Sequence, residues 1–259
     1  MARSVDYDKI AATYERRYDD NEYAGTEHAL LRFVGDAPRV RVLEVGCGTG
    51  HWLTLLSRRG IRVAGLDASA QMLAGALRHA PAAALAHGRA EHLPWRDAAF
   101  DRVVCINALH HFGDPLAFLQ EARRVLRPGG AVMTIGLDPH TGLDQWCIYD
   151  YFDATLAIDK RRYAPAERIR EWMAAAGFIE CATALVEHLP IRLLARDALD
   201  QGRLDKGVTS QLAVLTDEEY QRGIDRIRAE IQAAARRGEA LYLTADLRLY
   251  GTFGSVASQ

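Results

Sequence analysis

Apolar residues follow two different periods in the first half of the chain. Runs such as 101–106 are almost wholly apolar, as a strand buried on both faces of a sheet should be. Between these runs, apolar residues recur every three or four positions, which is the period of one helix face. The pattern predicts strands at 41–45, 61–67, 85–87, 101–106 and 131–137, alternating with helices at 51–59, at 70–79 and from 115 onward.

The rhythm changes after Leu137, and residues 138–165 are rich in Tyr, Trp, Phe and Asp without a clean period. The elements expected later are a helix at 165–176, a strand at 178–187, a polar insertion with helices at 190–238 and a last strand at 241–253. Alternating strands and helices indicate parallel βαβ units. We therefore predict an α/β fold: a Rossmann-like, doubly wound, mostly parallel seven-stranded sheet with helical lid or cap insertions.

The charge balance argues against a nucleic-acid partner. Lys and Arg total 32 against 34 Asp and Glu, so the formal net charge is only −2. No run of five like charges occurs, whereas nucleic-acid binders usually carry a basic excess or a basic stripe. The composition favours a small-molecule partner.

Cysteine spacing and the first residues bear on metal sites and cellular location. The four cysteines, at 47, 105, 147 and 181, lie far apart with no Cys-x-x-Cys pair, so neither a zinc site nor a disulfide framework is expected. Residues 1–20 are polar rather than signal-like, and no apolar run of 18 residues occurs. We expect reduced thiols, no metal, no membrane segment and a cytoplasmic location.

The strongest motif is a glycine cluster at the end of the first predicted strand. Gly46, Gly48 and Gly50 follow Val42–Val45, and Asp67 ends the next strand 21 residues after Gly46. Glycine has no Cβ and tolerates positive φ, so a ligand can approach the backbone closely. A carboxylate at the position of Asp67 can accept hydrogen bonds from the two ribose hydroxyls of an adenosine group. The motif therefore predicts an adenosine-containing cofactor.

Two cofactors compete for this geometry. The dinucleotide fingerprint needs a third small residue, and here that position is His51, while Gly50 comes one place early. Glu44, just before the loop, would repel a pyrophosphate but tolerates the sulfonium and amino acid of S-adenosylmethionine (SAM). The predicted cofactor is SAM, with S-adenosylhomocysteine as product.

Several segments in order resemble the class I SAM-dependent methyltransferases, especially the branch of ubiquinone, menaquinone and small-molecule enzymes. The matching segments, all between residues 1 and about 137, are 43–50, 65–73, 88–95 with 100–101, and 123–130. The resemblance implies that Asp67 holds the ribose, with Ala68 beside it in the same segment, and that Met72 packs near the adenine. Arg89 stands where many members have an Asp that accepts a hydrogen bond from the adenine, and arginine cannot accept one. Adenine recognition would then fall to the backbone of Ala90 and Glu91 or to the Glu91 carboxylate.

Candidates for the chemistry follow the fourth predicted strand, at the sheet edge where ligands bind. Asn107 is expected beside the cofactor. His111 is the candidate acid–base or acceptor-orienting group, with Tyr14 from a short helix expected at 7–14. The alternative is architectural: one histidine packs in the loop while the other caps the next helix. Tyr14, with Tyr7, is also a candidate lid over the cofactor, or else packs the helix on the core.

The aromatic segment 146–152 is expected either to line an acceptor pocket or to be plain core. An Asn/Asp-Pro-Pro-Tyr motif is absent after the fourth strand, which argues against methylation of amino nitrogens in DNA bases or glutamine. We predict one domain, 1–259, with a cofactor-binding half at 1–137 and substrate-cap insertions near 138–165 and 190–238. The predicted activity is methyl transfer from SAM to a small molecule by in-line displacement. The alternatives are a SAM-binding protein without methyl transfer and an NAD-dependent oxidoreductase.

Overall fold

The computed structural model describes residues 5–8, 10, 23–35 and 39–258. These residues form two compact units, which are described separately. The core unit comprises Ala24–Asp138, Tyr163–Glu187 and the chain from Leu249 onward. The insertion unit comprises Pro139–Arg162, His188–Arg248 and the described residues before Ala24.

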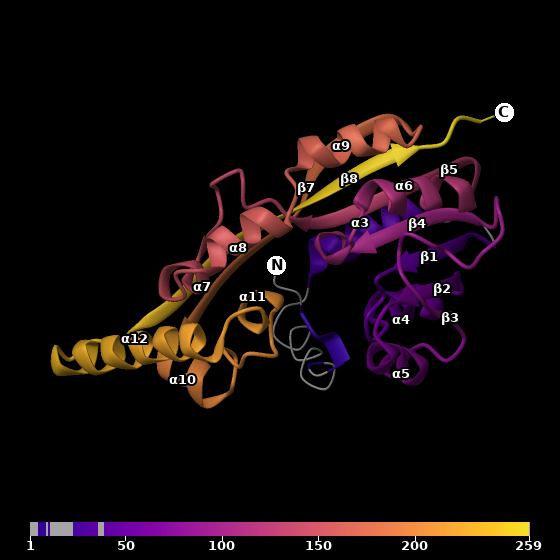
Figure 1. Ribbon diagram of the computed structural model, residues 1–259. Helices are drawn as coiled ribbons and strands as arrows, with labels where there is room; N and C mark the ends of the chain where they lie inside the picture. Colours follow the sequence, from indigo (N-terminus) through magenta and orange to yellow (C-terminus); the bar gives the residue numbers. More distant parts are fainter. Residues whose placement is uncertain (1–4, 9, 11–22, 36–38, 259) are drawn as a thin grey trace. The chain divides into compact units, whose positions relative to one another are not determined.

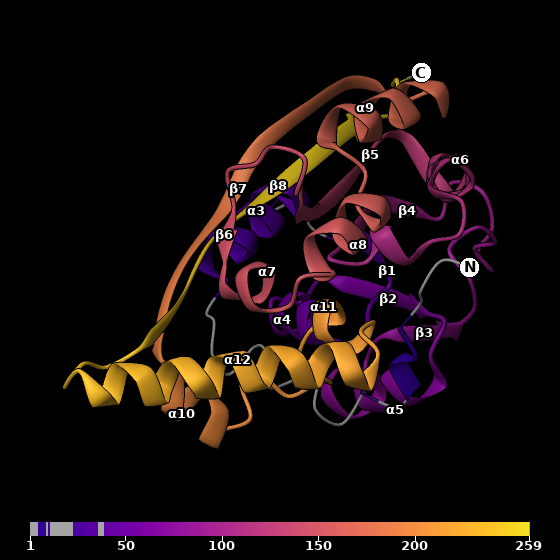
Figure 2. The ribbon, with the colours of Figure 1, turned by 60° about the vertical axis from the view of Figure 1, so that its left-hand side comes forward.

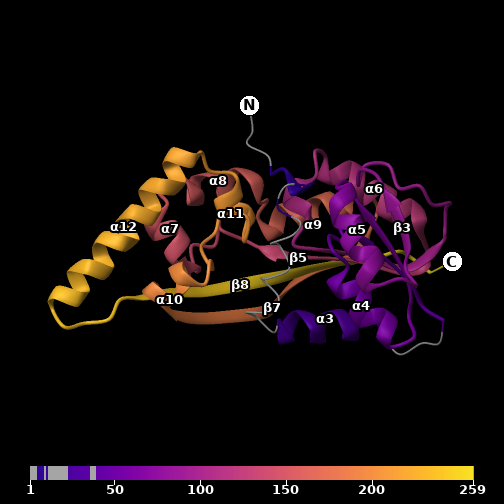
Figure 3. The ribbon, with the colours of Figure 1, turned by 90° about the horizontal axis from the view of Figure 1, so that it is seen from below.

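A largely parallel sheet organises the core unit (Figure 1). Its parallel strands lie in the order β3-β2-β1-β4-β5, and β8 pairs antiparallel with β5. β7 pairs with β8, and the pair is visible in Figure 3. The bounds are β1 Arg41–Val45, β2 Arg62–Asp67, β3 Ala84–His87, β4 Phe100–Ile106, β5 Leu126–Leu137, β7 Ile179–Leu194 and β8 Tyr242–Ser255. This arrangement confirms the predicted fold class.

The helices of the core unit flank the sheet in pairs. α4 packs beside α5, and α6 packs beside α9. Ser69 and Asp114 cap α5 and α6 with side-chain oxygens, so the expected Asp-Pro helix start at 114–115 is confirmed. The bounds are α3 Ala24–Val34, α4 His51–Arg58, α5 Ala70–His79, α6 Pro115–Val125 and α9 Ala166–Ala175, with the 3-10 turn η1 at Leu109–His111.

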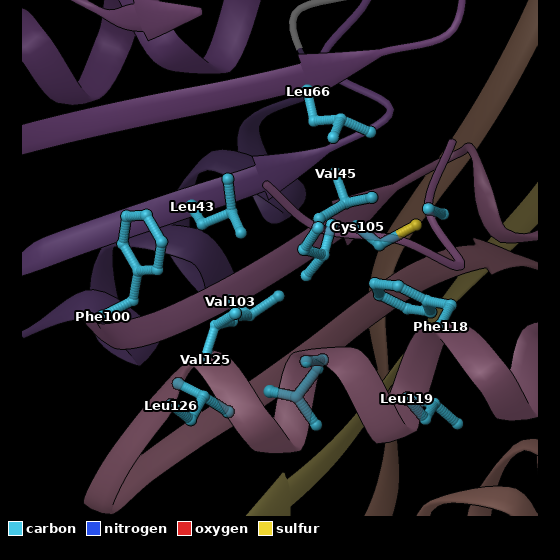
Figure 4. Packing of buried hydrophobic residues seen from close by; sticks show 14 of the residues in the cluster. Leu43, Val45, Leu66, Phe100, Val103, Cys105, Phe118, Leu119, Val125 and Leu126 are labelled. Atoms are coloured by element: carbon cyan, nitrogen blue, oxygen red, sulfur yellow. The ribbon is translucent and has the colours of Figure 1, made fainter. Parts of the chain in front are cut away.

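Burial on both faces of the central strands gives the core unit its apolar interior. Leu43 on β1 and Val103 on β4 are fully buried, and so are Phe118 and Leu119 on α6. Figure 4 shows these side chains in the cluster of buried apolar residues that the strands and the helix share. The core fixes the ends of β1, β2 and β4, where the glycine loop and Asp67 lie.

The insertion unit is mainly helical and has its own apolar cluster. α12 packs beside α7 and α10, as Figure 2 shows. Ile148 and Phe152 are buried with Ile224 and Ile227, and a Cβ at Gly223 would lie 2.2 Å from the Phe152 ring. The bounds are β6 Gln145–Trp146, α7 Cys147–Tyr151, α8 Thr155–Arg162, α10 Ala195–Asp200, α11 Ser210–Ala213 and α12 Asp217–Arg236.

Several boundaries differ from the sequence-based expectation. β7 continues to Leu194, so residues 190–194 are strand rather than helical insertion. Pro190 marked a break in the sequence, but proline is tolerated in a strand that, like β7, pairs on one side only. β6 is an additional two-residue strand that pairs with β8, making eight strands rather than seven. Two helices, α7 and α8, occupy the segment that showed no period.

The single-domain assignment and the boundary at 137 stay predictions. Most of the two expected insertions, 138–165 and 190–238, lies in the insertion unit. Of the expected helix at 7–14, residues 7, 8 and 10 are helical. None of the helices that the structure describes is long and apolar enough to cross a bilayer.

Candidate cofactor site

A sharp turn after β1 begins the site. The backbone N–H groups of Gly46 and Cys47 both donate to the Leu66 carbonyl, at 2.8 and 3.0 Å. Gly46 has φ +76°, and a Cβ there would lie 2.4 Å from the Ala108 Cβ. Only glycine fits this position, because both the backbone conformation and the neighbouring chain exclude a side chain.

Gly48 occupies the open part of the loop. Its φ is +52°, and apart from its two chain neighbours no described residue has an atom within 4 Å of a Cβ built on it. The protein's own packing therefore does not require glycine here, whereas a ligand lying against the backbone would. The Gly48 N–H donates to Asp67 Oδ2 at 2.8 Å, which fastens the loop to the end of β2.

Asp67 is held in one orientation by backbone amides. Besides Gly48, the Ser69 N–H donates to Oδ1 at 2.9 Å. Burial raises the pKa of the Asp67 carboxyl, and the backbone amides and His87 partly oppose that rise. Each carboxylate oxygen accepts more than one hydrogen bond, so Asp67 retains capacity for two ribose hydroxyls.

Glu44 supplies a second, deeper carboxyl group. Its side chain is 1% exposed, and its Oε2 atom has no hydrogen-bond partner among the residues that the structure describes. Burial, and secondly the nearby Asp67, raises the pKa of Glu44 well above its usual value. A buried polar atom without a partner is rare in a protein interior. Two carboxyl groups beside an open glycine loop fit a cationic adenosyl compound and oppose a pyrophosphate.

Ala68, Met72 and Ala90, which are predicted to lie near the cofactor, differ in their exposure to solvent. Ala68 is exposed, and its carbonyl lies 2.9 Å from His87 Nε2. Met72 is 1% exposed, and Ala90 is also buried in the core, so any contact from Ala90 would be made by its backbone. The roles predicted for Ala68, Met72 and Ala90 stay predictions.

Glu91 supports the loop that precedes α6. Its Oε1 accepts the N–H groups of Gly113 at 2.8 Å and Asp114 at 3.1 Å, and its Oε2 lies 3.3 Å from Arg89 Nε. Burial raises the pKa of Glu91, but these amides and Arg89 lower it further, so the pKa of Glu91 lies below its usual value. Sequence reasoning missed this supporting role, and the adenine role stays a prediction.

The histidine pair lies just past β4. Asn107, with φ +53°, donates its N–H to the Ile135 carbonyl at 2.7 Å and turns the chain into η1. The His110 ring stacks on Tyr163, with centroids 3.9 Å apart and planes 18° apart, and its centroid lies 3.9 Å from that of His111. His110 therefore packs in the loop, as the architectural interpretation expects of one histidine. The cap of α6 is Asp114 and not His111. Tyr163 gave no signal in the sequence.

His111 is half-buried in this stack and keeps its candidate role. Tyr14 lies outside the described residues. Cys47 and Cys105 are buried, and burial raises the pKa of both thiols, so neither supplies a thiolate. No group of three or more metal-binding side chains occurs among the described residues.

The site thus gathers the ends of three neighbouring parallel strands. β1 brings Glu44 and the glycine loop, β2 brings Asp67, and β4 brings Asn107 and the histidine pair. Ligands of open α/β sheets bind at this carboxyl edge, where the strand order reverses.

Comparison with known proteins shows what the segment that carries the glycine loop and Asp67 is similar to. Residues 43–134 match the profile of the family described as a methyltransferase domain. Demethylmenaquinone methyltransferase of Staphylococcus saprophyticus is 32% identical over 145 residues, which cover 53% of this chain and 62% of that protein. Malonyl-[acyl-carrier protein] O-methyltransferase of Hamiltonella defensa is 33% identical over 135 residues, covering 50% and 52%. The chain spans between about half and three-fifths of the length of these two relatives.

The fold has solved counterparts. A structure attributed to a methyltransferase of an antibiotic biosynthesis pathway in Anabaena variabilis gives a TM-score of 0.66 at 21% identity, covering 88% of this chain and 96% of that one. This likeness concerns the fold alone, whereas the family match includes the glycine loop and Asp67. Residues 43–134 are therefore similar to a methyltransferase domain, and the matched segment includes the glycine loop.

Proposed function

We propose that the protein binds SAM in the loop 46–50 and transfers its methyl group to a small-molecule acceptor, releasing S-adenosylhomocysteine. The observation that carries the proposal is the open backbone at Gly48, whose N–H donates to Asp67, on a loop that directly follows the strand of the buried Glu44. We also propose that it acts in the cytoplasm.

Asp67 would hold the ribose through oxygens already oriented by two backbone amides. Glu44 would balance the positive charge of the ligand, since a buried carboxylate is stabilised by a nearby cation. SAM supplies a methyl group that is already activated by the sulfonium, and its transfer is an in-line displacement. The protein's remaining task is to align the acceptor atom and exclude water.

His111 is the proposed general base for an acceptor that starts protonated. Its ring belongs to the stack with His110 and Tyr163, so its orientation is restricted. General bases contribute roughly 10²–10⁴-fold to rate. We expect His111→Asn to lower kcat by about that range with little change in the Kd for SAM. A loss of SAM affinity equal to the loss of kcat would assign His111 to cofactor binding instead.

The acceptor class is supported by charge and by the relatives' names. The near-neutral chain offers no excess of basic residues for a nucleic acid. The relatives' names specify a quinone precursor and an acyl group on a carrier protein. We propose a small organic acceptor on these grounds.

The test is an incubation with methyl-labelled SAM and a small-molecule extract. We expect a labelled product that accumulates in step with S-adenosylhomocysteine, and Asp67→Ala should lower both signals when SAM is limiting. SAM binding without any labelled product would contradict methyl transfer and support a protein that uses SAM in another way. Turnover of NADH in place of SAM would support an oxidoreductase.

A further inference from the structure

The insertion unit contains a cavity of about 320 Å³, which is lined in part by Trp146, Tyr149 and Asp150 of the aromatic segment 146–152. Small-molecule sites usually measure roughly 300–1,000 Å³, so the cavity has room for a small ligand. Its wall is formed from both ends of the unit's sequence, by 139–160 and Thr244. The lining residues that matter here are Asp144, Trp146, Tyr149, Asp150, Leu156 and Lys160.

Two aromatic rings form one corner of the cavity. The Trp146 and Tyr149 ring centroids lie 5.3 Å apart with planes at 72°. The Tyr149 hydroxyl donates to Asp159 Oδ2 at 2.9 Å, and Asp159 Oδ1 lies 3.3 Å from Arg162 Nη1. The Asp159 side chain is 1% exposed, so the Tyr149 hydroxyl is anchored to a buried ion pair, which restricts the position of the Tyr149 ring. The aromatic corner is therefore preorganised.

Among the charged residues that line the cavity, carboxylates outnumber ammonium groups by two to one. Asp144 is half-buried, and its Oδ1 accepts the Arg248 backbone N–H at 2.8 Å, which fixes the carboxylate. Asp150 has no ion pair with any residue that the structure describes, and the same holds for Lys160. Two carboxylates and one ammonium among the lining residues leave the cavity with one excess negative charge.

We propose that this cavity binds a small organic molecule that carries an ammonium group. A cation against an aromatic face is attracted by the ring's quadrupole, and Trp is the best such face. The Asp144 and Asp150 carboxylates supply hydrogen-bond acceptors for the same group. Leu156 adds an apolar surface for the body of the ligand. The proposal goes beyond methyl transfer and does not depend on SAM binding.

A matched probe series tests the charge requirement. Phenethylamine, 2-phenylethanol and 3-phenylpropionate share an aromatic ring on a short chain and are cationic, neutral and anionic at neutral pH. We expect phenethylamine to bind about tenfold more tightly than 2-phenylethanol, as a desolvated cation–π contact supplies. The anionic probe should bind least. Ligand-observed NMR titration of the full chain measures all three.

Substitutions of the two cavity carboxylates test whether phenethylamine binds in this cavity. Asp144→Asn retains an oxygen for the Arg248 amide, and Asp150→Asn changes only an exposed side chain. Each should weaken phenethylamine binding several-fold. Asp225→Asn, on the exposed face of α12 and outside the cavity, is the control and should leave binding unchanged. Unchanged melting temperatures show that all three variants fold.

Two results would overturn the proposal. One is equal binding of phenethylamine and 2-phenylethanol, including no binding of either. The other is the same affinity in Asp144→Asn and Asp150→Asn as in Asp225→Asn. Both results are independent of labelled product formation from SAM, so a failure here leaves the methyltransferase proposal standing.

Discussion

The buried carboxyl groups of the core unit and of the insertion unit have different partners. In the core unit, the buried Glu44 has no hydrogen-bond partner for its Oε2 atom among the described residues, and Asp67 accepts hydrogen bonds from the backbone N–H groups of Gly48 and Ser69. In the insertion unit, the buried Asp159 is paired with Arg162 and bonded to the Tyr149 hydroxyl. The first arrangement leaves carboxyl groups whose ionised form a bound cation would stabilise, whereas in the second arrangement the carboxylate already has its cation.

This difference separates a general site from a variable one. The segment 43–134, which matches the methyltransferase profile, lies entirely in the core unit and ends before Pro139, where the chain enters the insertion unit again. Its carboxyl groups suit the proposed cofactor, SAM. The insertion unit instead uses its buried pair to fix the wall of its own cavity, which suits a ligand particular to this protein.

The largest expected effect is on the buried pair. Asp159→Ala leaves the Arg162 guanidinium buried without its partner and should lower the free energy of unfolding by about 3–5 kcal/mol. Asp153→Ala breaks an exposed ion pair with Arg226 and should cost less than about 1 kcal/mol. Guanidinium denaturation measures both. Similar small losses would show that the insertion unit does not depend on its internal charge balance.

Glycine substitutions separate packing from ligand approach within the loop. Gly46→Ala adds a Cβ 2.4 Å from Ala108 at φ +76° and should destabilise the fold by about 3 kcal/mol. Gly48→Ala meets no atom and should cost only about 1 kcal/mol, from its left-handed backbone. Gly35→Ala, with φ +73° and open space around its Cβ, is the matched control.

Gly48→Ala and Gly35→Ala, the two variants expected to be mildly destabilised, should differ in their affinity for SAM. Gly48→Ala and Gly35→Ala should melt at similar temperatures, but only Gly48→Ala should lose SAM affinity, because its Cβ enters the space of the ligand. Calorimetric titration with SAM compares them. Equal SAM affinity in both variants would remove Gly48 from the site.

A smaller effect is the pH dependence of stability caused by Glu44. Its pKa in the folded protein is raised above the ordinary value of 4.5, so the folded state retains a proton that the unfolded state releases. The stability from this group is present in full below pH 4.5 and is lost as pH rises through the folded pKa. The maximum slope for one proton is about 1.4 kcal/mol per pH unit.

Glu44→Gln removes this titration, so wild type should lose stability relative to the variant as pH rises above about 5. Denaturation curves at several pH values measure the difference. A difference that stays constant with pH would show that Glu44 is ionised in the folded protein and has a partner there.

The parts of the molecule that sequence could predict are the local ones. The glycine turn follows from backbone conformations that only glycine adopts readily, and the Asp-Pro start of α6 follows from helix capping within four residues. Alternating strand and helix periods predicted the order of β1 to β5. These features depend on neighbours in the chain.

Features that depend on distant neighbours were missed. Glu91 accepts N–H groups 22 and 23 residues away, and Tyr163 stacks on His110 from a different segment. β7 continues past Pro190 because the strand pairs on one side only, which no local pattern reveals. The insertion unit's helices α7 and α8 are short, so their periods were too brief to read.

The most direct test of the account is calorimetric titration of wild type and Asp67→Ala with SAM and with NADH. Asp97→Ala, at an exposed carboxylate in the same unit, is the control. We predict that wild type binds SAM but not NADH, and that Asp67→Ala weakens SAM binding by roughly 1.5–3 kcal/mol, the range for hydrogen bonds to a charged group. NADH binding without SAM binding, or equal SAM affinity in Asp67→Ala and Asp97→Ala, would contradict it.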